Sequence, residues 1–136
     1  MKRWLRYFFA LVVGAHGCIY FIFGLGRLPD PLKGWRGTSW LLGNAITGDK
    51  LKAFAFGLSR IAGIATLTCA VAVAFAKPSP HGLWRPLAMT GAVFSIVVFA
   101  VFWDGQTENL VNQGVIGVAA SALLFLSALL FPRAFG

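Results

Sequence analysis

The chain has 136 residues, of which 58% are hydrophobic and only 12% are charged, and its mean hydropathy is +0.77. This composition lies outside the range of ordinary soluble domains and indicates a protein embedded in the lipid bilayer. The net charge of +8 does not indicate a nucleic-acid partner, because the basic residues are spread over the termini and loops, where they anchor helix ends and contact anionic headgroups. We expect one all-α domain, since about four spanning helices would use the whole length.

Four apolar runs approach the length that crosses the hydrocarbon core of a membrane. In chain order they cover residues 4–25, 54–76, 87–103 and 110–131. A backbone in lipid must satisfy its own hydrogen bonds, and no run alternates with a period of two, so the fold predicted is a four-helix transmembrane bundle. The first run continues through "IYFIFGL" after Cys18, which favours a retained anchor over a cleaved signal.

The connection at 26–51 is the only one long enough to have a structure of its own, and it contains "GWRGTSWLLGNAITGD". Trp35 and Trp40 are typical headgroup-level anchors, and the two leucines after Trp40 predict a short interfacial helix over the bundle. We therefore expect an interfacial segment that includes Trp35, Arg36, Ser39 and Trp40. The alternative is that this loop is a lid over a cavity.

The basic residues give a small excess to the face that carries both termini. That face has Lys2, Arg3, Arg6, Lys77, Arg85 and Arg133, against Arg27, Lys33, Arg36, Lys50 and Lys52 on the other. Because basic loops stay on the cytoplasmic side, six against five favours cytoplasmic termini.

Two cysteines and two histidines do not have the close spacing of a zinc site, and no phosphate-binding loop or nucleophile elbow is visible. At about 1.5 Å per residue, Cys18 lies roughly 10 Å deep and Cys69 roughly 24 Å deep, so we expect both to be unpaired. His81 falls in a connection on the face farther from His16, which argues against a haem held by both. The sequence thus predicts no metal site and no catalytic residue, and it leaves any cofactor unknown.

Polar side chains at similar depth in one half of the bilayer form the candidate ligand-binding site. Counted at about 1.5 Å per residue from one face, Tyr20 is roughly 7 Å deep, Arg60 roughly 10 Å and His16 roughly 13 Å. The full set is His16, Tyr20, Arg60, Asn112 and Gln113, with Asp104 and Glu108 near the mouth. Ionisable residues inside a membrane are costly unless partnered. We therefore predict that His16 faces inward and shares a polar cavity with Tyr20 and Arg60, which suits a quinone carbonyl or a lipid headgroup.

Structural roles for the same residues remain open. Arg60 is about two turns from its helix end and could snorkel to the surface. His16 could be a neutral imidazole bonded to a neighbouring helix, with Tyr20 beside it one turn later. Asn112 and Gln113 could cap the fourth helix and hold helices together.

Four short motifs carry a family resemblance over nearly the whole chain. They are "HG" in the first run, "WRGTSWLL" in the first loop, "LWRPLA" entering the third run and "NLVNQG" entering the fourth. Together they resemble small four-helix bacterial membrane proteins of the DoxX-like class. The resemblance implies a place in the bacterial inner membrane, beside quinol-oxidase or thiol-oxidation complexes. Relatives often carry a second histidine one turn after the first, where this chain has Tyr20, and that argues against a metal or haem at this pair.

Three functions compete on these grounds. The first is a non-catalytic accessory or assembly subunit of a larger membrane complex, for example a respiratory one, with protein subunits or a second copy as partners. Small-residue pairs such as Ala10 with Gly14 and Gly117 with Ser121 favour it, because they let helices approach closely. The second is a binder or redox handler of a small lipophilic molecule such as a quinone. A transporter or channel has the least support, since no inverted repeat is visible.

Overall fold

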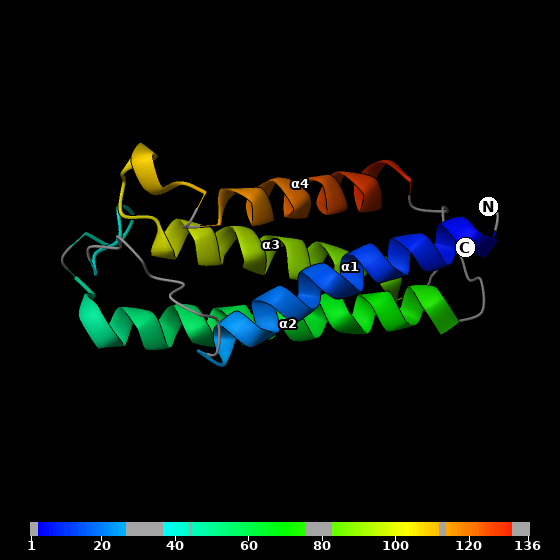
Figure 1. Ribbon diagram of the computed structural model, residues 1–136, viewed down its shortest axis with the longest axis horizontal. Coiled ribbons are helices and arrows are strands. Elements are labelled where there is room, and N and C mark those ends of the chain that lie inside the picture. Colours follow the sequence, from blue (N-terminus) through cyan, green and yellow to red (C-terminus); the bar gives the residue numbers. More distant parts are fainter. Residues whose placement is uncertain (1–2, 27–36, 44, 76–82, 112–113, 132–136) are drawn as a thin grey trace.

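The computed structural model describes residues 3–26, 37–43, 45–75, 83–111 and 114–131, without the side chains of Arg3 and Asn109. Its elements are α1 (Arg3–Gly24), α2 (Gly48–Phe75), α3 (Trp84–Phe102), the short 3-10 helix η1 (Thr107–Asn109) and α4 (Val115–Leu130). Helices α2, α3 and α4 lie roughly parallel or antiparallel in a layer, and α1 crosses that layer at an angle (Figure 1). The all-α four-helix bundle predicted from the sequence is confirmed.

Three of the described helices are long and apolar enough to cross a membrane. These are α1, α2 and α3, so the chain is a multi-pass membrane protein by helix length and hydropathy. The fourth helix has 16 residues, about 24 Å at 1.5 Å per residue, which is shorter than the hydrocarbon core of about 30 Å. It begins at Val115 instead of residue 110, because Gly114 has a φ of 101° that a right-handed helix does not contain.

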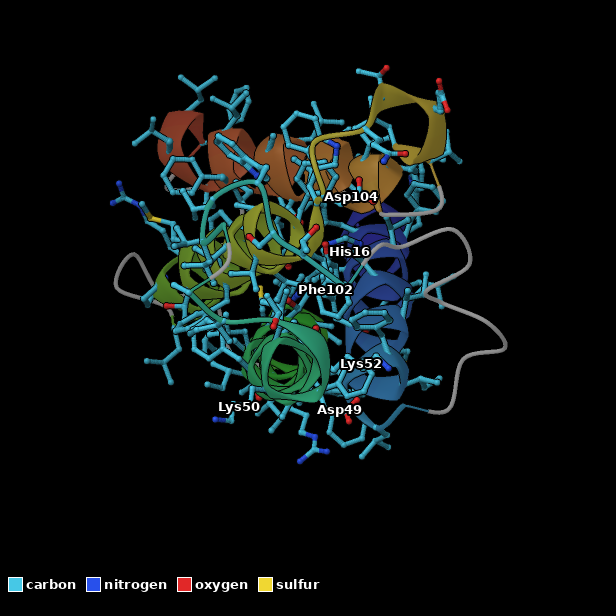
Figure 2. The ribbon with its side chains drawn as sticks, turned by 90° about the vertical axis from the view of Figure 1, so that its left-hand side faces the viewer. His16, Asp49, Lys50, Lys52, Phe102 and Asp104 are labelled. Atoms are coloured by element: carbon cyan, nitrogen blue, oxygen red, sulfur yellow. The ribbon has the colours of Figure 1, made fainter. Side chains whose placement is uncertain are left out.

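The second helix begins at Gly48, well before the apolar run that starts at residue 54. Its first turn includes Asp49, whose carboxylate interacts favourably with the positive end of the helix dipole at the N-terminus. The same carboxylate lies 3.5 Å from the Lys52 ammonium. Hydropathy does not detect these charged turns. Because of these additional turns, α2 extends well past the end of α1 at the loop end of the bundle (Figure 1). Figure 2 shows Asp49, Lys50 and Lys52 around this start of α2.

Glycines set the close approach of α1 to α2. A Cβ at Gly63 would lie 2.7 Å from the backbone nitrogen of Phe21, and a Cβ at Gly17 would lie 3.0 Å from the backbone nitrogen of Leu67. Neither space admits a side chain. In lipid, where helices gain nothing from excluding water, such small residues allow the van der Waals contact that holds helices together.

Two apolar clusters fill the bundle on either side of a polar layer. The cluster near the start of α1 includes Val13, Cys69, Val73 and Trp84. The cluster near the loops includes Leu51, Val98 and Phe102 among its members. Between them along α2 lies Thr66, which is fully buried and donates a hydrogen bond to the Ala62 carbonyl. This layer also holds the side chains that join α1 to the other helices.

Gly63→Ala should destabilise the bundle by about 1–3 kcal/mol, because the new methyl group would press against the rigid backbone of Phe21. Gly57→Ala on the same helix is the matched control, since its Cβ would have no neighbour within 4 Å. That change should be neutral or stabilising by up to about 1 kcal/mol. Reversible unfolding in bicelles measures both, and equal effects of the two substitutions would contradict the close packing described above.

Candidate functional site

Four side chains from three helices form a polar cluster in the middle of the bundle. His16 and Tyr20 come from α1, Ser95 from α3 and Ser121 from α4, and we call this group the central polar cluster. Both serines are 0% exposed and Tyr20 is 9% exposed, whereas His16 is half-buried. Figure 2 shows His16 between α1 and the pair formed by α3 and α4.

Ser121 joins α4 to α1. Its hydroxyl donates to the Gly117 carbonyl one turn earlier, at 2.8 Å, and its oxygen lies 2.9 Å from His16 Nε2. A hydroxyl has one proton, and here that proton is used within α4. With that proton on the Gly117 carbonyl, the serine oxygen accepts from Nε2–H of His16, and the high cost of a charge inside a membrane favours the neutral imidazole. This leaves Nδ1 with a lone pair that can accept a hydrogen bond.

Tyr20 joins the same group to α3. Its phenol oxygen contacts the side chains of Ser95 and Ser121, and because both serine protons are used within their own helices, its single proton is donated to only one of them at a time. Its ring meets the His16 ring edge-on at 5.0 Å. Ser95 donates its proton to the Gly91 carbonyl at 2.8 Å, so its oxygen is left to accept from the phenol. A Cβ at Gly117 would lie 2.9 Å from the Tyr20 oxygen, so this glycine gives the phenol its space beside α4.

The cluster is well suited to holding helices together inside a membrane. Each serine hydroxyl donates to its own helix and accepts from α1, which satisfies polar groups that would otherwise be costly in hydrocarbon. Helix α1 packs chiefly against α2 and touches α4 over only a few residues. The bond from His16 to Ser121 is therefore a main link between α1 and α4.

Arg60 has a different place from the one predicted. Its Nε donates to the Gly24 carbonyl at 2.8 Å, and its side chain is exposed. A cation at this position interacts favourably with the negative, C-terminal end of the α1 dipole. It also satisfies one of the carbonyls that a helix leaves without an intrahelical partner at its C-terminus. Gly24 follows His16 by eight residues, about 12 Å along the axis. The structure thus brings Arg60 to the end of α1, and it brings Tyr20 and Ser121 to His16.

The predicted mouth residues lie outside the central polar cluster. Asp104 is half-buried in the turn after α3, where its Oδ1 accepts from the Gln106 backbone nitrogen at 3.1 Å. Glu108 is exposed on η1. Asn112 and Gln113 fall outside the described residues, so their predicted role stays a prediction.

The first loop packs on the end of α3 through Trp40. Its backbone nitrogen donates to the Trp103 carbonyl at 2.9 Å, and the two indole rings lie 5.3 Å apart. The buried Ser39 hydroxyl accepts from the backbone nitrogens of Leu41 and Leu42, each at 3.2 Å. Residues 39–43 thus form a tight turn, and the short interfacial helix expected there is not present in this described part of the loop. Trp35 and Arg36 lie outside the described residues.

Ser95 and Ser121 are the site residues whose polar role the sequence alone does not predict. A single serine inside an apolar run is a weak signal, because its hydroxyl can always bond back to its own helix. The sequence pattern predicts Gly117 and Ser121 only as a pair of small residues that lets helices approach. The signal that could have indicated the role of Ser121 as a partner of His16 is its depth in the membrane. Ser121 lies at the depth of His16 when α4 starts at Val115.

The described residues contain no group of three or more histidine, cysteine or acidic side chains that could hold a metal ion. Cys69 is buried and donates to the Trp84 carbonyl at 3.3 Å, while Cys18 is exposed, and the two are unpaired as predicted. Comparisons of this chain with protein-family models, with curated proteins and with solved structures found no match.

A double-mutant cycle between His16→Ala and Ser121→Ala should give a coupling free energy of about 0.6 kcal/mol, and up to about 1.7 kcal/mol, because each substitution removes the same interhelical bond. Ser127→Ala is the matched control, since Ser127 donates to the Leu123 carbonyl within α4. Its coupling to His16→Ala should be near zero. Unfolding in bicelles gives the free energies, and strictly additive effects for His16 and Ser121 would refute the link.

Proposed function

We propose that this protein is a non-catalytic accessory or assembly subunit of a larger membrane complex. The observation that carries the proposal is the hydrogen bonding of the central polar cluster. His16, the ionisable residue at mid-helix, is used to connect α1 with α4, and the serines around it donate to their own helices. An arrangement of this kind fixes the shape of the bundle, which is what a scaffold subunit requires.

The outward faces support the same proposal. Large apolar side chains on α4 are widely exposed, among them Ile116, Leu123 and Leu130. At 16 residues, α4 is also shorter than the other three helices. A short helix with an open apolar face is suited to contact with helices of another subunit, since a hydrophobic stretch shorter than the bilayer is relieved by oligomerisation.

We place the proposed subunit in a bacterial inner membrane with both termini in the cytoplasm. This setting rests on the resemblance to the DoxX-like class and on the excess of basic residues on the face of the termini. A respiratory complex is the partner that the resemblance favours.

A second candidate is the binding of a lipophilic small molecule at His16. One observation favours it: the imidazole is only half-buried, and the proton on Nε2 leaves Nδ1 as an acceptor. An acceptor of this kind fits the hydroxyl of a quinol better than the carbonyl of a quinone.

Isolation of the tagged protein from its own host, at its natural expression level and in a mild detergent, separates the two candidates. For an accessory subunit we expect a complex of fixed stoichiometry whose other subunits fail to assemble when the gene is deleted. His16→Leu should weaken this assembly only as far as it lowers stability, with Gly63→Ala as the comparison for a purely structural loss.

Mass spectrometry of lipids extracted from the same sample gives the opposing outcome. A stoichiometric quinol that disappears in folded His16→Leu protein, with no partner subunit present, would replace the accessory role by the second candidate. A protein that is isolated alone and without bound quinol would contradict both.

A further inference from the structure

An open apolar groove of about 570 Å³ runs along the outer side of the contact between α1 and α2. Its floor is made of small residues, Ala10, Gly14 and Ala70, and its walls include Leu11, Val71 and Phe75. The wall side chains are widely exposed, with Phe75 at 81% and Leu11 at 70%. This groove is separate from the central polar cluster and shares no lining residue with it.

The length of the groove fits one acyl chain in one leaflet. From Tyr7 to Gly14 the axis of α1 advances about 10 Å, and from Leu67 to Phe75 that of α2 advances about 12 Å. Half of a hydrocarbon core of about 30 Å is about 15 Å. The lining residues belong to the start of α1 and the end of α2. These two helix ends lie at the same end of the bundle (Figure 1).

The end of the groove nearest the surface is basic. Arg6 precedes the first lining residue, Tyr7, and its Nε donates to the carbonyl of Val73, which lies between lining residues of α2. This hydrogen bond holds the guanidinium between α1 and α2 at the surface end of their contact. The acidic residues that the structure describes, Asp49, Asp104 and Glu108, belong to the opposite end of the bundle. A phosphate at the Arg6 end therefore meets positive charge without a competing carboxylate.

We propose that this groove binds an anionic phospholipid, with one acyl chain between α1 and α2 and the phosphate at Arg6. Charge complementarity at the surface end selects the anionic headgroup, and the small-residue floor accommodates the chain below it. A basic residue in contact with the headgroup favours an anionic lipid over a neutral one by about fivefold. This inference is independent of the accessory-subunit proposal, because it uses a different surface.

The test uses the full-length protein in nanodiscs made from equal amounts of phosphatidylglycerol and phosphatidylcholine. Native mass spectrometry after release from the nanodiscs counts the retained lipids of each kind. The wild-type protein should retain phosphatidylglycerol about fivefold over phosphatidylcholine. Arg6→Gln keeps a donor for the Val73 carbonyl but removes the charge, so it should abolish the preference, and Arg6→Lys should restore most of it. Arg85→Gln, at the exposed start of α3 on the same end, should leave it unchanged.

A second pair of variants tests the acyl chain separately from the headgroup. Thr68→Phe places a ring in the groove at an exposed position and should lower retention of both lipids. Ile64→Phe, one turn away and outside the groove, should not. Equal retention of the two lipids by the wild-type protein, or an unchanged preference in Arg6→Gln, would overturn the proposal. A dimer that Thr68→Phe dissociates would show instead that a second copy fills the groove.

Discussion

The hydrogen bond between His16 and Ser121 is the interaction on which the position of α1 relative to α4 depends. In hydrocarbon a polar group has no water to bond, so an imidazole at this depth needs a partner within the protein. Ser121 supplies that partner from α4 while its own proton stays within α4. Tyr20 extends the same group to Ser95 on α3. One polar cluster thus connects the helix that crosses the bundle with two helices of the layer beneath it.

Close backbone contact makes this connection geometrically possible. Gly17 and Gly63 let α1 lie directly on α2, and Gly117 gives the Tyr20 phenol room beside α4. The same packing fixes the end of α1 against Arg60, whose guanidinium nitrogen satisfies the Gly24 carbonyl. His16 and Arg60 therefore have separate structural roles, one at the centre of α1 and one at its end.

The sequence predicts the class of fold well because hydropathy and length are strong constraints in a membrane. It predicts registers poorly, since an apolar run does not show where a helix begins. Charged residues hide the first turns of α2, and measuring depth from residue 54 puts Arg60 level with His16. With α2 starting at Gly48, Arg60 meets the end of α1 instead. The inward position of His16 and its proximity to Tyr20 agree with the prediction, whereas Ser121 could be identified only once α4 was placed.

The most direct test of this account is the protonation pattern of the His16 ring in a bilayer, measured by nitrogen-15 solid-state NMR on protein labelled at histidine, with His81→Gln to leave one signal. The account predicts a neutral ring with the proton on Nε2, because Ser121 donates to Gly117 and accepts from the imidazole. Ser121→Ala should change the Nε2 shift, while Ser127→Ala should leave it unchanged. A proton on Nδ1, or an Nε2 shift that does not respond to Ser121→Ala, would contradict it.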